Sequence, residues 1–210
     1  MNAFTTHKGI IAPLQRANVD TDQIIAKQFL KSIKRTGFGE SLFYDWRYDE
    51  NGQANADFEL NNPAFNGASL LVAGNNFGCG SSREHAVWAV DQYGFRVVIA
   101  PTKKTDQAMM PGFADIFRNN CGKNGILTIE LTEDEVNQIF EAITANPGIE
   151  ASADLNTQTF TLHSTNPLEF KFEIDSAVKH RLLNGLDDIA TTLNHVAQID
   201  TFETQHNTYL

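Results

Sequence analysis

The clearest pattern of apolar and polar positions lies between residues 69 and 100. An apolar run over residues 69–73 meets a glycine-rich stretch at residues 74–80, which predicts a buried strand followed by a loop. Apolar side chains then recur at the spacing of one helix face, at Ala86, Ala89, Val90 and Tyr93. Gly94 ends this pattern before a second apolar run over residues 95–100. The segment therefore predicts a β-α-β unit with parallel strands and a right-handed crossover.

A second helix is predicted where Thr132 and Glu135 have the spacing of a capping box and the turn residues 146–148 end the pattern. Its apolar face is formed by Val136, Ile139, Phe140 and Ile143. Residues 159–163 and 170–174 then have the composition of strands separated by polar residues. We expect these two strands to pair antiparallel.

Two further helices are predicted near the end of the chain. Asp175 or Ser176 can cap a helix that carries Val178 and Leu182 and ends near Gly185. The other helix is outlined by Leu186, Ile189, Ala190 and Leu193.

The first part of the chain carries a weaker pattern. Residues 9–12 are a short strand candidate and residues 18–22 a turn, whereas residues 37–67 predict a long irregular region containing aromatic residues. Loops of that length in a compact domain usually serve a ligand or a partner.

Composition favours one globular domain. The 210 residues are 41% hydrophobic and 20% charged, and no Pro- or Gly-rich linker divides them. We expect a single domain over residues 1–210, whose C-terminal tail, about residues 194–210, can extend from it. No apolar stretch approaches the roughly 18 to 20 residues of a membrane span, and the first residues lack the charged-then-apolar order of a secretory signal. These observations predict a cytoplasmic protein without a membrane partner.

Charge and cysteine content exclude further classes. Sixteen basic and 26 acidic residues give a net charge of −10, which repels the phosphates of nucleic acids and acidic membrane surfaces. The two cysteines, Cys79 and Cys121, are too few for a disulfide framework or for a closed zinc or iron–sulfur site built from cysteines. We therefore expect no nucleic-acid partner and no metal bound by this chain, so that any metal cluster belongs to another chain.

Residues 78–85, Gly-Cys-Gly-Ser-Ser-Arg-Glu-His, lie between the first strand of the β-α-β unit and its helix. Unpaired backbone N–H groups at a helix start favour an anion, and glycines let the backbone approach it closely. Arg83 adds a planar, permanently charged fork that suits a carboxylate or a phosphate. No lysine lies between residues 69 and 98 for a phosphate-binding loop, and Arg83 stands where a dinucleotide fingerprint needs its third glycine. The pattern thus predicts a site for an anion and argues against a nucleotide.

Each residue of this segment also has a simpler interpretation. Ser81 and Glu84 have the spacing of a capping box, which would give Ser81 a purely structural role. His85 lies four residues after Ser81, where a serine–histidine pair is sterically conceivable, although a histidine there more often packs or forms hydrogen bonds. Cys79 lies where a helix dipole can lower a thiol pKa, but only its position marks it as a nucleophile.

The string GNNFGCGSSREHA, residues 74–86, resembles the core motif of the small subunits of 3-isopropylmalate dehydratase. That family is similar to the swivelling C-terminal domain of aconitase. The resemblance spans about residues 4–193, because further blocks agree in the same order, at residues 18–25, 29–31, 35–38, 113–117 and 182–189. It implies an α/β fold, the swivelling β/β/α domain of the aconitase C-terminal type, with a central β-α-β unit.

The resemblance also implies a reaction and a partner. Members of the family act with a large subunit that carries a [4Fe–4S] cluster, which agrees with the small number of cysteines here. The reaction, a step of leucine biosynthesis, isomerises 2-isopropylmalate to 3-isopropylmalate by losing water to give 2-isopropylmaleate and adding it back at the neighbouring carbon. The implied activity is that of a hydro-lyase acting on a small dicarboxylate, and this chain alone is expected to be inactive.

The catalytic roles that the resemblance implies fall on three adjacent residues. Ser81 is similar to the serine whose deprotonated oxygen takes and returns the carbon-bound proton. Arg83 matches the arginine that holds a substrate carboxylate, and Ser82 matches its hydrogen-bonding neighbour.

Residues 27–38 match the substrate-recognition loop of the family. Phe29, Leu30 and Ile33 are expected to meet the isopropyl group there. Arg35 is expected to meet a carboxylate. Core packing and a solvated charge explain these residues equally well.

Two segments carry open questions. Asp20 and Asp22 have a spacing that can bind metal, but beside Asn18 and Thr21 it favours a hydrogen-bonded turn that shapes the base of the recognition loop. Residues 102–112 are an insertion relative to the family. It follows a strand on the same edge as Ser81, so it could reach the substrate, contact the large subunit or be a disordered surface loop. We favour a surface loop or a subunit contact, with solvated lysines.

Three alternatives to the leading function remain. A related hydro-lyase would keep the chemistry and act on citraconate, a methyl- or dimethylmalate, or homoaconitate. A stand-alone serine hydrolase would use Ser81 and His85, but the G-x-S-x-G pattern is missing. A non-catalytic anion-binding module would be favoured if the insertion blocked the pocket.

Overall fold

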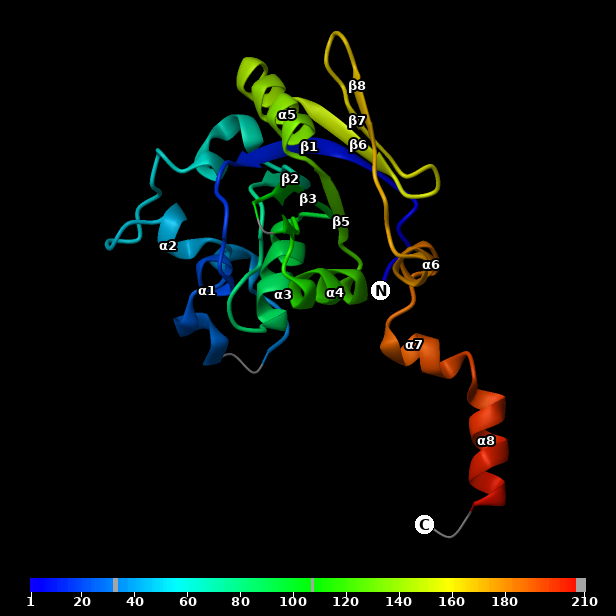
Figure 1. Cartoon of the computed structure of the whole chain (residues 1–210). Helices are drawn as coiled ribbons and strands as arrows, with labels where there is room; N and C mark the ends of the chain where they lie inside the picture. The colour runs from blue at the N-terminus through cyan, green and yellow to red at the C-terminus, as the bar shows by residue number, and fades with distance from the viewer. Residues whose placement is uncertain (32–33, 107, 207–210) are drawn as a thin grey trace.

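The computed structural model describes residues 1–31, 34–106 and 108–206. A mixed sheet lies at the centre of the fold (Figure 1). Within these residues seven strands follow the order β4-β3-β2-β1-β6-β7-β8, and an eighth strand, β5, pairs with β3. The strands are β1 (Thr6–Leu14), β2 (Leu70–Ala73), β3 (Val97–Lys104), β4 (Met109–Met110), β5 (Leu127–Thr132), β6 (Glu150–Asp154), β7 (Thr159–Leu162) and β8 (Leu168–Lys171).

The parallel half of the sheet contains β1, β2, β3 and β5. Leu71 pairs with Val98, which pairs with Thr128 on its other side. All four residues of β2 are buried, as expected for strands that are covered on both faces. The predicted β-α-β unit is confirmed, since β2 and β3 are parallel and are joined by helix α3 (Glu84–Tyr93), which ends at Gly94 with φ +120°.

The antiparallel half extends the sheet from β1. Residues 6–10 of β1 pair antiparallel with β6, while residues 11–14 pair parallel with β2. Strands β7 and β8 form the predicted antiparallel pair, although β8 lies nearer the turn than predicted because Leu168 pairs with Leu162. One strand thus belongs to both halves and joins them into a single sheet.

Helices cover both sides of the parallel strands: α5 (Glu133–Ala145) lies on one side, and α3 and α4 (Asp115–Asn124) lie on the other (Figure 1). The predicted capping box begins α5, where the Glu135 N–H donates to Thr132 Oγ1 (3.3 Å) and the Thr132 N–H donates to Glu135 Oε2 (2.8 Å). The predicted helix α6 (Ser176–Asn184) is capped by Asp175 and ends at Gly185.

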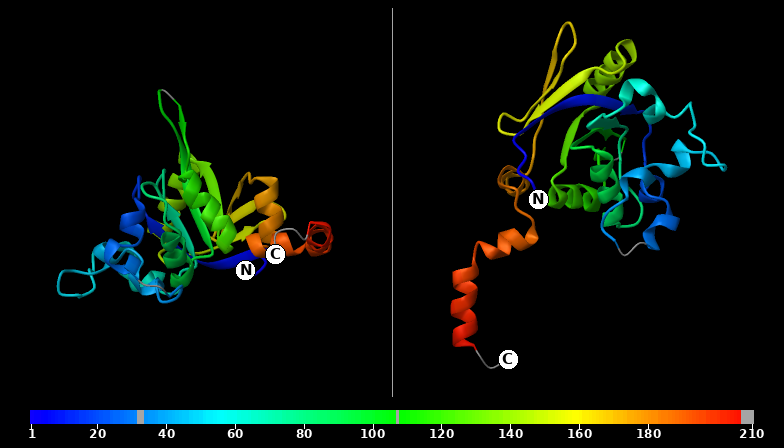
Figure 2. Two further views of the ribbon diagram at one scale, coloured as in Figure 1. Left: turned by 90° about the horizontal axis from the view of Figure 1, so that it is seen from below. Right: turned by 180° about the vertical axis from the view of Figure 1, so that it is seen from behind.

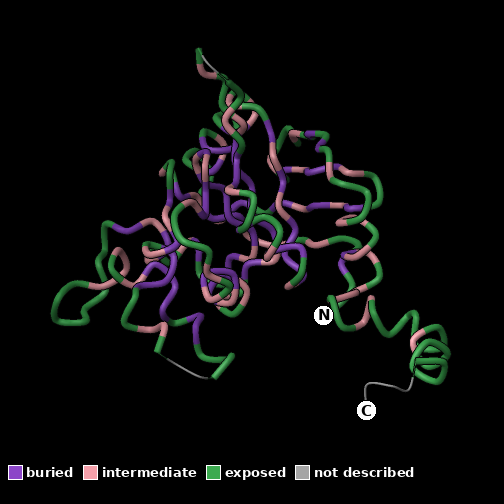
Figure 3. The backbone as a smooth tube through the Cα atoms, turned by 60° about the horizontal axis from the view of Figure 1, so that its bottom comes forward, coloured by how far each residue is buried: buried purple, intermediate pink, exposed green. Residues whose placement is uncertain are grey.

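Residues 37–67 are irregular, as predicted, but they are firmly packed. The short helices between β1 and β2 are α1 (Thr21–Ile24), η1 (Lys27–Lys31), η2 (Gly39–Ser41), α2 (Tyr44–Arg47), η3 (Glu59–Asn61) and η4 (Pro63–Phe65). Their anchors are buried apolar side chains: Phe38, Leu42, Phe43, Phe58, Leu60 and Phe65. Figure 3 shows that the buried parts of the chain, in purple, gather at the centre of the molecule.

The insertion at residues 102–112 forms a hairpin in its described part. Strand β3 continues to Lys104 and pairs antiparallel with β4, and the hairpin projects from the body in the left view of Figure 2. The alternative of a disordered loop is therefore wrong for these residues. Lys103 and Lys104 are exposed, as expected for solvated lysines, and Lys103 Nζ lies 3.3 Å from Glu133 Oε1 at the surface.

The chain ends in two helices, α7 (Asp188–Leu193) and α8 (Val196–Gln205), which extend away from the body (Figures 1 and 2). We refer to residues 187–206 as the C-terminal arm. The helix predicted from residue 186 onward forms as α7, but Ile189 and Leu193 on its apolar face are exposed. Among the described residues, no helix combines the length and the apolar character that crossing a bilayer requires.

Candidate active site

The glycine-rich loop at residues 74–83 follows β2 at the carboxyl edge of the parallel strands. Gly78 and Gly80 have φ angles of +77° and +88°, in a backbone region that residues other than glycine rarely adopt. A Cβ atom at position 78 would collide with the Phe117 ring, and one at position 80 would collide with the Asp20 carboxylate. Both glycines are therefore required by backbone conformation and by close packing.

One side of this loop is fastened to the turn at residues 18–22. The Gly78 N–H donates to Val19 O (2.8 Å), and the Thr21 N–H donates to Cys79 O (2.8 Å). Thr21 Oγ1 donates to Ser81 O (2.8 Å). These bonds hold the backbone of Ser81 in place and leave its hydroxyl free to act elsewhere.

Asp20 forms the turn that was predicted for this segment. Its Oδ1 atom accepts from the Asp22 N–H (2.6 Å), and its own N–H donates to Gln23 Oε1 (2.8 Å), so that it caps α1. In the part of the chain that the structure describes, no group of three or more His, Cys, Asp or Glu side chains is arranged to hold a metal ion.

The other side of the loop is fastened to the end of the hairpin. The Asn76 N–H donates to Pro111 O (3.2 Å), and the Phe77 N–H donates to Gly112 O (2.8 Å). The Ala114 N–H in turn donates to Phe77 O (3.0 Å). The insertion thereby places the first turn of α4 directly opposite the Ser81 segment.

Between α4 and the loop lies a pocket of about 270 Å³. Ser81, Ser82 and Arg83 line one side together with Thr21 and the two glycines. The opposite side is formed by α4 and the residue before it: Ala114, Asp115, Ile116, Phe117 and Asn120. No described residue of the hairpin between 102 and 112 lines this pocket, so the insertion does not block it.

Ser81 is not the cap of α3, which corrects the expectation of a Ser81–Glu84 capping box. The helix begins at Glu84, and the residue before it, Arg83, is extended and makes no side-chain cap. Glu84 instead accepts from Asn124 Nδ2 (3.4 Å). Ser81 is exposed, and no described residue forms a hydrogen bond with its hydroxyl. The hydroxyl is consequently available to a ligand in the pocket.

Arg83 is held at the pocket by an ion pair with Asp22. The side chain of Arg83 is only 17% exposed, and Asp22 Oδ2 also lies 3.2 Å from Lys27 Nζ at the start of η1. A guanidinium has five N–H donors, so one carboxylate partner leaves others for a bound anion. The ion pair orients the cation and links it to the segment that begins at Lys27.

His85 and Cys79 have surroundings that fit their simpler interpretations. The His85 ring packs against Phe38 and Trp88, with centroids 5.3 and 4.7 Å away. Among the described residues, no hydrogen bond connects His85 to Ser81. Burial and the nearby Asp20 carboxylate raise the pKa of the Cys79 thiol. A neutral thiol is a weak nucleophile and a poor metal ligand.

The described residues of the expected recognition loop do not line the pocket in the chain alone. Phe29 packs edge-on against Tyr44 with centroids 5.0 Å apart, and Leu30 packs against the core. The Arg35 guanidinium lies over the Trp88 ring at 5.5 Å. Ile33 lies outside the described residues. The substrate-binding roles of these four residues remain predictions.

The sequence did not lead us to predict two parts of the site, Thr21 and the wall formed by α4. Thr21 supports the Ser81 carbonyl, and its presence in the agreeing block at residues 18–25 was the available signal. The wall formed by α4 was also missed, although residues 113–117 stood out as a further agreeing block. Asp115 in this wall is paired with Arg118 (3.0 Å), which reduces its repulsion of an anion in the pocket.

Comparison with known proteins identifies the family. The model of the aconitase C-terminal domain matches residues 1–134. The chain belongs to the aconitase C-terminal domain family. Among family members, the 3-isopropylmalate dehydratase small subunit of Desulforapulum autotrophicum is 54% identical over 210 residues, which are 100% of this chain and 98% of that protein. The resemblance deduced from residues 74–86 is thus confirmed.

A solved structure of the family supports the fold. The crystal structure of 3-isopropylmalate dehydratase (leuD) from Methanocaldococcus jannaschii matches with a TM-score of 0.61 and 23% identity, over 95% of this chain and 98% of that chain. At this level of identity the comparison bears on the fold alone. The predicted α/β swivelling fold is confirmed.

Proposed function

We propose that this chain is the small subunit of a 3-isopropylmalate dehydratase, a hydro-lyase completed by a large subunit. The observation that carries the proposal is the 54% identity over the full chain to a small subunit of that name. The pocket supports it, because Ser81, Ser82 and Arg83 meet there without any other use of the Ser81 hydroxyl. The substrate in this proposal is a small dicarboxylate that carries an isopropyl group.

The loss and the re-addition of water each require a specific role from these residues. Removing the proton from the carbon beside a carboxylate breaks a C–H bond, and its electron pair forms the C=C bond as hydroxide leaves the neighbouring carbon. Ser81 Oγ takes this proton and returns it when water adds back. Negative charge develops on the adjacent carboxylate, where the Arg83 guanidinium and the Ser82 hydroxyl stabilise it.

A serine oxygen is a weak base unless its charged form is stabilised. Here Ser81 lies two residues from a guanidinium and close to the N–H groups that begin α3. A pocket closed by a partner would exclude water and strengthen both interactions. The need for closure explains why a chain with an open pocket is expected to be inactive alone.

The [4Fe–4S] cluster is assigned to the large subunit in this proposal, where it supplies a Lewis acid for the departing hydroxyl. The two cysteines of this chain do not fit such a cluster. Cys121 is fully buried, which raises its pKa well above the usual value, and the pKa of Cys79 is raised as well. The cytoplasmic location and the identity of the large subunit are part of the same proposal.

Reconstitution tests the proposal. The chain is mixed with the cluster-loaded large subunit of the same organism and supplied with 2-isopropylmalate, and formation of 2-isopropylmaleate is followed by its ultraviolet absorbance. We expect activity from the mixture and none from either subunit alone. Full activity of the isolated chain, or no activity of the mixture, would refute the proposal.

A related hydro-lyase is the second candidate, since the pocket residues that hold a carboxylate do not select an alkyl group. The same reconstituted enzyme is therefore offered citraconate, dimethylmalate and homoaconitate at equal concentrations. A kcat/KM for one of these above that for 2-isopropylmalate would change the substrate assignment and leave the reaction class intact.

A further inference from the structure

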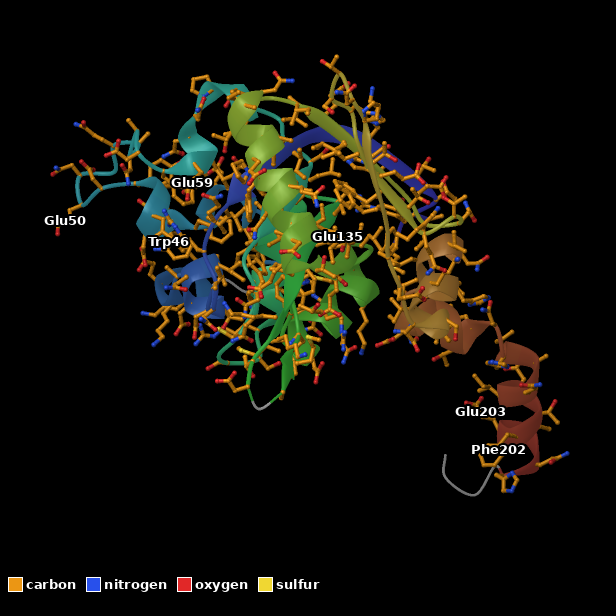
Figure 4. The ribbon with its side chains drawn as sticks, turned by 45° about the horizontal axis from the view of Figure 1, so that its top comes forward. Trp46, Glu50, Glu59, Glu135, Phe202 and Glu203 are labelled. Atoms are coloured by element: carbon orange, nitrogen blue, oxygen red, sulfur yellow. The ribbon has the colours of Figure 1, made fainter. Side chains whose placement is uncertain are left out.

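The C-terminal arm presents apolar side chains that the rest of the described chain leaves largely exposed. Ile189 and Leu193 on α7 are 72% and 59% exposed, and Val196 and Phe202 on α8 are 49% and 60% exposed. No residue of α8 is buried, and Figure 4 shows Phe202 on the arm well away from the body. An apolar row of this kind on a protruding helix is typical of an interaction surface.

The charge of the arm argues against a second copy of this chain as the occupant. Residues 187–206 contain four carboxylates and no lysine or arginine, and the whole chain has a net charge of −10. Pairing two such arms would bring like charges together. A partner with an apolar groove and a basic rim fits the arm better.

The arm is continuous with the candidate active site. Ile116, 52% exposed, and Asn120 line the Ser81 pocket and also a neighbouring hollow of about 300 Å³. Lys123 and Arg181 line this hollow too, and both pair with Asp188 at the start of α7, at 2.8 and 3.3 Å. One face therefore runs from the pocket along α4 to the root of the arm.

The comparisons with known proteins bear on the function of the arm. The match of the family model for the aconitase C-terminal domain ends at residue 134 and does not cover the arm. The relative that is named a small subunit matches all 210 residues, the arm included. The arm is therefore shared with a relative that is named a small subunit, which fits a role in subunit assembly.

We propose that the C-terminal arm, together with Ile116, is the docking surface for the large subunit that completes the Ser81 pocket. This inference rests on the proposed function. The apolar row of α7 and α8 enters a groove of the large subunit, and Asp200 and Glu203 on α8 face basic residues at its rim. The arm holds the two subunits together while the pocket and Ile116 meet the partner at the other end of the same face.

The test is a titration of the full chain into cluster-loaded large subunit at fixed concentration, with dehydratase activity as the readout. Phe202→Asp places a charge on the apolar row, and Thr201→Asp places the same charge on the opposite side of α8 as the matched control. We expect Phe202→Asp to raise the apparent Kd by at least about tenfold, as for an apolar anchor of an interface. Turnover at saturation should equal that of the wild type, and Thr201→Asp should bind normally.

The outcomes separate this inference from the proposed function. Normal binding by Phe202→Asp beside an active wild-type complex would overturn the docking role and leave the proposed function standing. A self-associated chain that Phe202→Asp converts to monomer, without any change in the Kd for the large subunit, would assign the arm to a second copy and also overturn it. No active complex from the wild type would refute the proposed function and this inference with it. Thermal melting of both variants alone should match the wild type, because neither side chain contacts the body.

Discussion

At the scale of single residues, the proposed chemistry depends on polar groups of Ser81 and Arg83 that the fold leaves available to a ligand. Helix α3 begins at Glu84, so no capping hydrogen bond engages the Ser81 hydroxyl. Arg83 does have a partner, Asp22, yet its guanidinium lines the pocket and keeps further N–H groups for an anion. Under the proposed function, this places a proton acceptor and a cation side by side in one short segment.

Replacing Ser81 by alanine should lower kcat of the reconstituted enzyme by roughly 10² to 10⁴, the range for loss of a general base. KM should change little, because the hydroxyl acts mainly in the transition state. Steady-state kinetics on 2-isopropylmalate, corrected for the assembled fraction, provide the measurement. Ser164→Ala, in the turn between β7 and β8, serves as the control. A kcat within about twofold of wild type would leave Ser81 without a catalytic role.

Replacing Arg83 by lysine should lower kcat/KM by at least about tenfold, through both a higher KM and a lower kcat. An ammonium cannot make the paired hydrogen bonds by which a guanidinium holds a carboxylate. The comparison is with Arg96→Lys, which alters an ion pair with Asp91 remote from the pocket. Unchanged kinetics for Arg83→Lys would place the substrate carboxylate elsewhere.

At the scale of elements, the site exists because three segments meet at the carboxyl edge of the sheet. The turn before α1 and the end of the hairpin each donate or accept backbone hydrogen bonds on one side of the glycine-rich loop. The loop is consequently positioned by contacts from both flanks and needs little support from α3. The glycines at 78 and 80 make this arrangement possible.

Gly80→Ala should damage the site, whereas Gly52→Ala should affect stability alone. Both positions have positive φ angles, +88° and +74°, so alanine costs about 1–2 kcal/mol of unfolding free energy at each. Only at Gly80 does the new Cβ also collide with a side chain, the Asp20 carboxylate that caps α1. Urea denaturation and reconstituted activity measure the two effects. Equal stability and activity of the two variants would contradict the close approach at Gly80.

At the scale of the whole molecule, titratable groups give the fold a pH dependence in two separate ranges. Burial, aided by Arg96, lowers the pKa of His7, whose Nε2 atom lies 2.7 Å from Ser69 Oγ. Hydrogen bonds lower the pKa values of Asp187 and Asp188, from the Ala190 N–H and from Lys123 respectively. Protonation of His7 changes the free energy of unfolding near neutral pH, and protonation of Asp187 and Asp188 changes it at acidic pH.

The free energy of unfolding should fall as the pH drops below about 6.5, because the unfolded chain then binds a proton that folded His7 still resists. Stability from this group is complete above that pH and is lost as the pH falls toward its lowered folded pKa. His7→Gln should remove this part of the slope, while His180→Gln, on the surface of α6, should not. Thermal melting between about pH 8 and pH 5 provides the measurement. Parallel curves for His7→Gln and wild type would exclude the effect.

Local patterns predicted those parts of the molecule that depend on neighbouring residues. The β-α-β unit, the capping box of α5 and the cap of α6 were all recognisable, because apolar spacing and capping act over a few positions. The double pairing of β1 and the hairpin after β3 were not recognisable. Strand partners are chosen by contacts between residues far apart, which a single sequence does not display.

By itself, the sequence predicted an anion site at residues 78–85 and determined that the chain belongs with the isopropylmalate dehydratase small subunits. Both conclusions rest on residue types at short, fixed spacing. Only the tertiary structure decided that Ser81 is free of α3, that Asp22 holds Arg83, and that α4 forms the opposite wall of the pocket. Each of these depends on where segments distant in the chain come into contact, as Thr21 and Ser81 do across 60 positions.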